Sequence, residues 1–174
     1  TSIDTLFFHN PNDADLIINN ISFFKDLLVK YPISKLGVSV YDPKEISALI
    51  SNPLELSFQF PYNVLDRRFE NLKMGIGRRY GRSIFLQGLL ASTKRIKKTS
   101  SKKLLNLHKS YHRFLEVEAL DPISLAISFA YKSKHIDYFL IGVDSKKQLK
   151  EIMNYKNYQI TDFDFLVNFL KEIK

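Results

Sequence analysis

Polar or small residues follow each of five apolar segments, and residues of these types can bind or polarise a ligand. They are His9, Ser39, Gln59, Gln87 with Gly88, and the run Gly142, Val143, Asp144 and Ser145. In parallel α/β proteins, ligand sites gather at the carboxyl ends of the strands. Polar residues often begin where any strand ends, but five such ends in succession would converge on one rim. The pattern therefore predicts a ligand site at that rim.

The last of these ends leads into a helical pattern that begins at Ser145 and runs to Asn154. The start of a helix presents free N–H groups and a partial positive charge, which together make a ready anion site. Anion binding is thus the chemistry that we expect at this end of the chain.

Strand-like and helix-like segments alternate along the sequence. Short apolar runs predict strands at residues 3–9, 36–41, 54–60, 83–87 and 135–141. Helical spacing and capping signals predict helices at residues 17–28, 43–51, 65–79, 102–117, 122–130, 145–154 and 161–173. Asp42 with Pro43, and Asp121 with Pro122, are typical helix starts because Asp caps the helix and Pro fits its first position.

This order favours an α/β fold with a parallel sheet and right-handed crossovers. Nearly continuous apolar strands suit a sheet that is covered on both faces. A closed (β/α)8 barrel needs about 250 residues for its eight units, and this chain holds five units. Two architectures remain open on these grounds: a partial barrel of five units, or a small flavodoxin-like open sheet. The sequence lacks the glycine-rich first loop that would mark a phosphate site in the second.

The composition is that of a globular protein. The 174 residues are 45% hydrophobic and 25% charged, which argues against disorder and fits a single domain over residues 1–174. Cysteine is absent, which excludes disulfides, thiolate zinc sites and a cysteine nucleophile. No apolar run approaches the ~18 residues of a membrane helix. No signal peptide opens the sequence, so we expect a cytoplasmic protein without a membrane partner. Thr1 replaces an initiator Met, so we expect a fragment or an otherwise trimmed chain.

One segment carries the whole net charge of +8. Lysines and arginines gather between residues 92 and 113 without a carboxylate, and the rest of the chain is neutral. Nucleic-acid-binding surfaces interleave basic groups with aromatics, whereas residues 94–103 contain no aromatic, so we expect no nucleic-acid partner. His108 and His112 have a spacing that can bind metal. No third ligand lies near them in the sequence, so we expect a solvated helix face and no metal.

Several motifs, in chain order, resemble those of the aldo/keto reductases. Residues 3–11 (IDTLFFHNP) are similar to that family's DxxxxHxP strand, and residues 36–40 (LGVSV) to its xGVSN strand. Residues 59–68 (QFPYNVLDRR) resemble its Q…N.LDRR stretch. Residues 82–90 (RSIFLQGLL) resemble a branch whose members often accompany surface-polysaccharide genes. Residues 141–149 (IGVDSKKQL) resemble the GxxSxxQL that opens the family's cofactor-phosphate helix.

The resemblance implies a (β/α)8 barrel that passes hydride from NAD(P)H to a carbonyl, with residues 1–174 as its C-terminal part, strands four to eight. The family's catalytic set is an Asp, a Tyr, a Lys and a His, and only the His is present here, as His9. The Tyr donates the proton, the Lys with its Asp partner lowers the Tyr pKa, and the His polarises the carbonyl. We expect the full-length parent to be an NAD(P)-dependent reductase and the segment alone to be inactive.

The resemblance also implies most of a cofactor site. Ser39 and Gln59 match the residues that hold the nicotinamide carboxamide, while Val40 stands where the family has Asn. The other cofactor-binding candidates are Arg82, Ser83, Phe85, Gln87, Gly88, Gly142, Val143, Asp144, Ser145, Gln148 and Glu151. NADP-preferring members often have Arg at the position of Asp144, so the cofactor is NAD or NADP, with a lean towards NAD.

By analogy with the polysaccharide-associated branch, the expected substrate is a small, sugar-derived carbonyl compound. A second hypothesis is a non-catalytic nucleotide-binding or interaction module. Five strands of an opened barrel leave two unpaired edges, and the first strand is strongly apolar. Such edges invite pairing with another chain, so an autonomous segment should self-associate.

Overall fold

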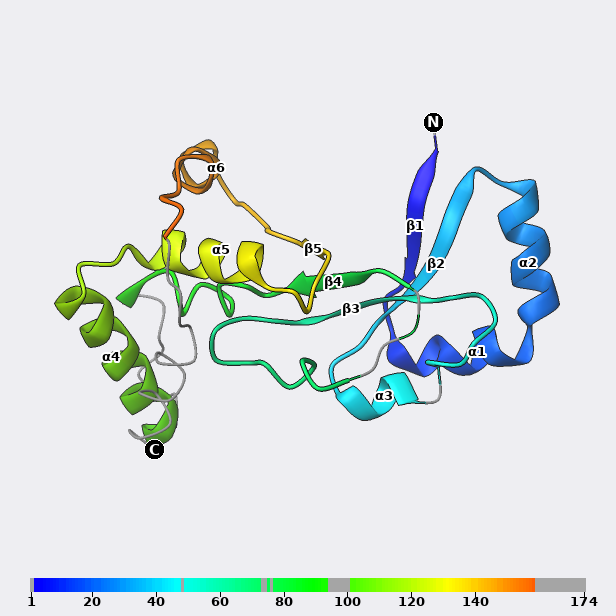
Figure 1. The fold of residues 1–174 in the computed structure, drawn as a ribbon, viewed down its shortest axis with the longest axis horizontal. Coiled ribbons are helices and arrows are strands. Elements are labelled where there is room, and N and C mark those ends of the chain that lie inside the picture. Colours follow the sequence, from blue (N-terminus) through cyan, green and yellow to red (C-terminus); the bar gives the residue numbers. More distant parts are fainter. Residues whose placement is uncertain (1, 48, 73–74, 76, 94–100, 159–174) are drawn as a thin grey trace. The chain divides into compact units, whose positions relative to one another are not determined.

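A computed structural model describes residues 2–47, 49–72, 75, 77–93 and 101–158 (Figure 1). Its strands are β1 (Ile3–Phe8), β2 (Ile33–Ser39), β3 (Ser57–Pro61), β4 (Arg79–Arg82) and β5 (Tyr138–Phe139). Its helices are η1 (Pro11–Asp13), α1 (Ala14–Asn19), α2 (Ile21–Lys30), α3 (Pro43–Ser47), α4 (Lys102–Val117), α5 (Pro122–Lys132) and α6 (Lys146–Met153). Residues 94–100, which belong to the basic segment, and the helix expected at residues 161–173 lie outside the described residues.

The five strands form one sheet in the order β1-β2-β3-β4-β5, which is also their order along the chain. Each of the pairs β1–β2, β2–β3 and β3–β4 is parallel. This arrangement confirms the prediction of an α/β fold with a parallel sheet. In the described part of the chain, no helix has the length and apolar character needed to cross a membrane.

The chain folds as two compact units. The first contains Thr1–Pro61, Arg67–Arg82 and Lys134–Tyr138, and therefore the four longer strands. The second contains Tyr62–Asp66, Ser83–Ser133 and Phe139–Lys174, and therefore α4, α5 and α6.

The sheet of the first unit has two chemically different faces. Side chains alternate between faces along a strand, and the residues on one face are large and apolar, including the fully buried Leu36, Val38, Phe58 and Phe60. On this face Phe8 contacts Phe24 of α2 edge to face, and Phe60 stacks on Phe69 at 4.4 Å. We call the other side the inner face. It carries Thr5, Phe7, Gly37, Ser39, Ser57, Gln59, Tyr80 and Arg82.

The sheet is curved around its inner face. In a flat sheet, β1 and β4 would lie about 14 Å apart, three strand spacings. The rings of Phe7 on β1 and Tyr80 on β4 nevertheless meet edge to face, with centroids 5.1 Å apart, and the Tyr80 hydroxyl lies 3.2 Å from the Thr5 hydroxyl. Arg78, just before β4, also reaches both carboxylate oxygens of Asp4 at 2.7 Å. Such curvature is expected of a barrel wall.

Acid should destabilise the first unit through two carboxylates. Hydrogen bonds from Thr5 and Arg78 hold the pKa of Asp4 below its usual value, and hydrogen bonds from Arg79 do the same for the pKa of Asp137. A carboxyl whose pKa is lower in the folded chain stabilises the fold above its unfolded pKa of about 3.9, and this stability is lost as the pH falls through the folded pKa. Urea midpoints measured from pH 7 to pH 3 should fall at the acid end.

The matched variants for this experiment are Asp137→Asn and Asp4→Asn. Each should lower the midpoint at pH 7 and flatten the acid part of the profile, because the group that titrates is gone. An unchanged acid profile in the double variant would mean that other groups dominate the pH dependence.

The helices of the second unit begin where the sequence predicts. The Asp121 carboxylate accepts the Ser124 N–H at 2.7 Å, with Pro122 at the first helical position of α5. The Ser145 hydroxyl accepts the Gln148 N–H at 3.2 Å at the start of α6. The bounds of α4 coincide with the predicted range of 102–117.

Two predicted elements of the middle of the chain are wrong. Residues 65–72 form turns rather than a helix, since the Asn63 side chain accepts the N–H groups of Leu65 and Asp66 at 3.0 Å each. The following strand, β4, runs from Arg79 to Arg82, and the predicted strand at 83–87 is a series of turns. Gly77 explains the shift, because a Cβ there would lie 1.8 Å from the carbonyl oxygen of Leu56. This close backbone approach brings the chain alongside β3 before residue 83.

Smaller differences concern α2, β5 and the histidine pair. The helix predicted at 17–28 is divided into α1 and α2 at Asn20, and β5 is shorter than predicted. His108 and His112 are buried rather than solvated, with rings 4.4 Å apart. Their Nε2 atoms lie within hydrogen-bonding distance of the carbonyl oxygens of Ser92 and Leu89, so these imidazoles tie α4 to the preceding loop. Burial and the neighbouring His112 lower the pKa of His108.

Candidate functional site

The inner face of the sheet brings Ser39 and Gln59 together. They are direct partners in the parallel register of β2 and β3, and Gln59 is in turn the partner of Tyr80 on β4. The ladder continues one residue further, since the Val40 N–H donates to the Gln59 carbonyl oxygen at 2.8 Å. Partners in a parallel pair present their side chains on the same face. A hydroxyl and a carboxamide therefore stand side by side at the carboxyl ends of these strands.

The Ser39 hydroxyl has an unused hydrogen-bonding capacity. Its side chain is 2% exposed, and its Oγ has no hydrogen-bond partner among the described residues. A buried polar group left without a partner costs about 1–3 kcal/mol. Buried groups of this kind are rare and call for an explanation such as function. A ligand that hydrogen bonds to Ser39 would recover this cost.

Arg82 reaches across the same strand ends. It is the register partner of Pro61 at the end of β3, and its Nη2 donates to the Val40 carbonyl oxygen at 3.1 Å. Its guanidinium carbon lies 4.1 Å from the centre of the Tyr41 ring, a cation–π contact. Val40 directly follows Ser39 in the chain. The Arg82 guanidinium is therefore bound to the backbone next to the residue with the unpartnered hydroxyl.

His9 lies at the same edge of the sheet. It directly follows β1, whose last residue, Phe8, is the partner of Val38 on β2. His9 itself lies in the bend after the strand. Its side chain is exposed, and the turn after it is closed by the side chain of Asn10, which accepts the Asn12 N–H at 3.0 Å. Ser39, Gln59 and Arg82 thus share one face at the carboxyl ends of their strands, and His9 follows the carboxyl end of β1.

The other candidates lie in the second unit, in two segments. The first segment directly follows β4 and has a left-handed backbone at Ser83, Leu86, Gln87 and Gly88, with φ of 58°, 45°, 54° and 87°. Such conformations in residues other than Gly cost about 1–3 kcal/mol each and cluster at functional sites. The loop is held locally: Phe85 accepts the Gly88 N–H at 2.9 Å, and the Asn63 amide donates to the Ser83 carbonyl at 3.2 Å. It is therefore a defined loop rather than an extension of the strand.

The second segment leads into α6. Gly142, Val143, Asp144 and Ser145 are all exposed. The Gln148 side chain accepts the Asp144 N–H at 2.7 Å while its own N–H donates to Ser145. This reciprocal pair resembles a capping box and gives Gln148 a role in starting the helix. Glu151 forms a 3.9 Å ion pair with Lys147, and both side chains are exposed.

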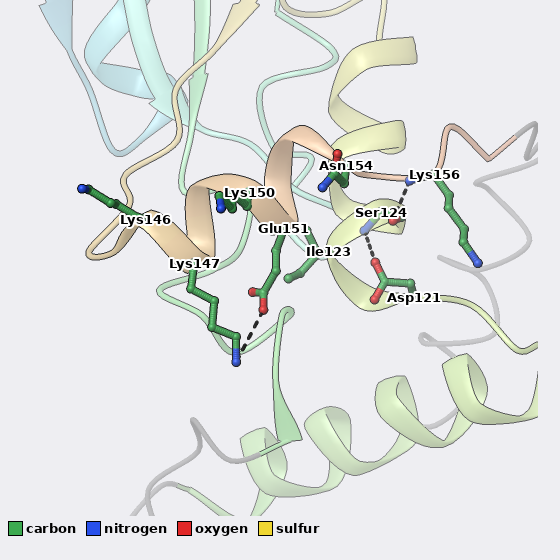
Figure 2. A pocket seen from close by; sticks show the side chains of 9 residues that line it. All are labelled: Asp121, Ile123, Ser124, Lys146, Lys147, Lys150, Glu151, Asn154 and Lys156. Atoms are coloured by element: carbon green, nitrogen blue, oxygen red, sulfur yellow. Dashed lines mark hydrogen bonds and ion pairs between the residues drawn. The ribbon is translucent and has the colours of Figure 1, made fainter.

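A cleft of about 890 Å³ lies beside α6 and the start of α5 (Figure 2). It is lined by Asp121, Ile123, Ser124, Lys146, Lys147, Lys150, Glu151, Asn154 and Lys156. Of these, only Glu151 is among the predicted cofactor-binding residues. The cleft depends on the segment after α6, where the Lys156 N–H donates to the Ser124 hydroxyl at 2.9 Å. That contact joins residues 32 apart in sequence, so no local signal could have indicated it.

Sequence reasoning also missed Tyr41 as a partner of Arg82, because no spacing rule connects the two residues. The described residues contain no cluster of three or more His, Cys, Asp or Glu side chains that could hold a metal ion.

Comparison with known proteins supports the fold. No protein-family model matches the sequence, and no curated protein matches it. Among solved structures, the aldo-keto reductase AKR11C1 from Bacillus halodurans (holo form) matches 99% of this chain with a TM-score of 0.74 and 19% identity. The glycerol dehydrogenase AKR11B4 from Gluconobacter oxydans matches 97% of it with a TM-score of 0.71 and 17% identity.

The chain spans 61% of the length of the first of these structures and 58% of the second. The resemblance expected from the sequence motifs is therefore confirmed at the level of the fold. The parallel five-stranded sheet in chain order, its curvature and these two matches agree. The chain has the α/β fold of the aldo-keto reductases, over a length that corresponds to part of their barrel.

Proposed function

We propose that this chain is the C-terminal part, strands four to eight, of an aldo-keto reductase that reduces a carbonyl compound with NAD(P)H. The observation that carries the proposal is that Ser39 and Gln59 are register partners on the inner face at the carboxyl ends of β2 and β3, with His9 directly after β1. The buried, unpartnered Ser39 hydroxyl supports it, because a bound carboxamide would supply the missing hydrogen bond.

The residues fit a nicotinamide dinucleotide in the following roles. In the first unit, Ser39 and Gln59 hydrogen bond to the carboxamide. In the second unit, two segments each suit a phosphate: the left-handed loop at 83–88 and the N-terminus of α6 after Ser145. The bound NAD(P)H supplies the hydride. His9 donates a hydrogen bond to the substrate carbonyl oxygen and stabilises the negative charge that develops there.

The proton donor of the family's catalytic set, its Lys and its Asp belong to barrel units that this chain does not contain. Activity is thus a property proposed for the whole barrel, and this segment alone should lack it. A small carbonyl compound, sugar-derived by analogy with the branch that residues 82–90 resemble, is the proposed substrate class, and the cytoplasm is the proposed location. One of the structural matches is a glycerol dehydrogenase, and this name denotes oxidoreductase chemistry for that protein.

A second candidate function, an interaction module, is favoured by the edge of the sheet. β1 is an edge strand, and its Ile3 and Leu6 side chains are 45% and 40% exposed. Exposed apolar edge strands pair with other polypeptide. Either the remaining units of a barrel or a second copy of the chain would cover this edge. The reductase proposal implies that the remaining barrel units cover it.

The test of the proposed function is direct binding of NADH and NADPH, followed by energy transfer from the tyrosines or by the nucleotide's own fluorescence. The reductase proposal predicts saturable binding, and Ser39→Ala should weaken it. A protein that binds neither nucleotide, yet self-associates through β1, would instead support the interaction module.

Asp144 should set the preference between the two nucleotides. A carboxylate there repels the 2′-phosphate of NADPH and accepts a hydrogen bond from the free 2′-hydroxyl of NADH. Replacing Asp144 by Arg should therefore strengthen NADPH binding about tenfold, since charge-assisted hydrogen bonds to phosphate are strong. NADH binding should weaken slightly. Dissociation constants from fluorescence titration measure both effects.

Asp144→Asn is the matched control, because it removes the negative charge without adding a positive one. It should give an intermediate NADPH affinity. Equal NADPH affinities for the original protein and Asp144→Arg would mean that the 2′-phosphate of bound NADPH does not lie near residue 144. That result would contradict the proposed role of Asp144. A clear preference of the original protein for NADPH would contradict the lean towards NAD.

A further inference from the structure

Arg82 has a feature that the neighbouring arginines lack. Arg78 is paired with Asp4 and Arg79 with Asp137, in each case through more than one hydrogen bond. Arg82 has no carboxylate partner among the described residues, and its Nη2 donates to a neutral carbonyl oxygen, that of Val40. A half-buried cation without a counter-ion, at the strand ends of a candidate site, calls for an anionic partner.

The guanidinium is held in one orientation before any ligand arrives. The Tyr41 ring supports its plane at 4.1 Å and the Val40 carbonyl oxygen binds one N–H, which leaves the remaining N–H groups available. A guanidinium has five N–H donors in a planar fork that matches the two oxygens of a carboxylate. Because two contacts already restrict the side chain, a ligand would lose little free energy in ordering it.

The surroundings point to the reacting end of the proposed site. Arg82 binds the residue next to Ser39, whose hydroxyl is the buried and unpartnered donor on the inner face. Ser39 and Gln59 are the residues proposed for the nicotinamide carboxamide. A ligand anion at Arg82 would therefore belong to the molecule that meets the nicotinamide.

We propose that Arg82 is a specificity-determining residue that binds the carboxylate of the substrate, so that the preferred substrates are carbonyl compounds that carry an acid group, such as 2-oxo acids. This inference rests on the proposed function and narrows its substrate class. Tyr41 and the Val40 carbonyl position the guanidinium, and His9 stands at the same end of the sheet for the carbonyl oxygen. The reaction would produce a hydroxy acid, with hydride from the nucleotide and a proton from the barrel's acid.

The test compares two carbonyl probes of similar size, pyruvate and the uncharged hydroxyacetone, in the complete protein with NADH bound. Binding is read from the Arg82 Nε–H resonance in ¹H–¹⁵N spectra, and turnover from NADH absorbance. Pyruvate should shift this resonance at saturation and should be preferred over hydroxyacetone in kcat/KM. Arg82→Met should weaken pyruvate binding about tenfold or more, because it removes charge-assisted hydrogen bonds, and its effect on hydroxyacetone should be clearly smaller.

Two further variants sharpen the experiment. Arg82→Lys keeps the charge and loses the planar fork, so it should recover only part of the pyruvate affinity. Lys44→Met removes an exposed cation from α3 and should change neither probe, which controls for net charge. If Arg82→Met fails to fold, the resonance shift in the unchanged protein and the Arg82→Lys variant still decide the matter.

Three results would overturn the inference: no pyruvate-dependent shift at Arg82, equal preference for the two probes, or equal losses for both probes in Arg82→Met. Tighter competition by inorganic phosphate than by pyruvate would also overturn it and would assign Arg82 to a phosphate. The NADH dissociation constant, measured in every variant, separates this inference from the proposed function. Tight NADH binding without a pyruvate-dependent shift of the Arg82 resonance rejects only the carboxylate site. Absence of NADH binding rejects the reductase proposal itself.

Discussion

Replacing both Ser39 and Gln59 by Ala should weaken NADH binding about a hundredfold, since each neutral hydrogen bond contributes about 0.5–1.5 kcal/mol and leaves an unpaired ligand group when lost. The two side chains are register partners on the inner face, so they would act on the same carboxamide. Fluorescence titration of NADH measures the effect, and each single variant should lose about tenfold.

Ser39→Ala has a second, less usual expectation. Because the Ser39 hydroxyl is buried without a partner among the described residues, its removal should not destabilise the free protein, and a gain of up to about 1 kcal/mol is expected. A variant that binds NADH more weakly but is as stable as the original protein, or more stable, would show that the Ser39 hydroxyl serves ligand binding rather than folding. Urea unfolding in the absence of nucleotide gives the stability.

Ser57→Ala is the matched control for these variants. Ser57 is also a buried serine of the inner face, but its hydroxyl already accepts the Arg78 N–H at 3.3 Å. Its replacement should cost some stability and leave NADH affinity unchanged. A Ser39→Ala protein that binds NADH normally while losing stability would show that Ser39 is structural, and the carboxamide role would be wrong.

Gly37→Ala should destabilise the fold by about 1–3 kcal/mol, the usual cost of forcing an extra methyl group into a packed core. A Cβ at Gly37 would lie 2.5 and 2.7 Å from two ring atoms of Phe7 and 3.0 Å from the Ser57 carbonyl oxygen. The Phe7 ring also contacts Tyr80 edge to face, which restricts how far it can move. Urea unfolding monitored by circular dichroism measures the change.

The clash can be tested by removing its second partner. Phe7→Ala alone should be destabilising, but Gly37→Ala added to it should cost much less than in the original protein. Gly142→Ala provides the matched control, because no atom lies within 4 Å of the added Cβ, and its effect should stay within about 0.5 kcal/mol. Full additivity of the Phe7 and Gly37 changes would contradict the packing described here.

The parts of the fold that could be predicted from the sequence are those set by local chemistry. Asp121 with Pro122, and Ser145 with Gln148, identify the starts of α5 and α6 because the capping side chain and the N–H that it accepts are three residues apart. The alternation of apolar runs with such helices was sufficient to predict a parallel sheet. The ordered motifs were sufficient to predict the aldo-keto reductase fold, which the structural matches confirm.

Two of the errors arose where distant residues decide the local structure. An apolar run at 83–87 has the pattern of a strand, yet the close approach of Gly77 to Leu56 makes residues 79–82 the strand instead. His108 and His112 lie among lysines in the sequence, but carbonyl oxygens of the preceding loop bind both rings in the interior. These contacts have no signature in a single sequence.

The candidate site shows the same division. His9, Ser39 and Gln59 were predicted as strand-end residues, and the register of β2 and β3 gives Ser39 and Gln59 a common face. The contact of Arg82 with Tyr41 and Val40 could not be predicted. It joins the end of β4 to the segment after β2, about 40 residues away in the sequence. That the buried Ser39 hydroxyl lacks a partner among the described residues also could not be predicted, because it depends on the positions of all the atoms around it.

A residue-by-residue map of NADH binding, from ¹H–¹⁵N amide shifts of the complete protein, shows whether the inner face of the sheet holds the nicotinamide. The account predicts the largest changes at Ser39, Gln59 and the Gln59 side-chain amide, with a second set at Gly88 and Ser145. Saturating NADH that leaves Ser39 and Gln59 unchanged, or that perturbs only the cleft beside α6, would contradict the claim that the inner face of this sheet holds the nicotinamide.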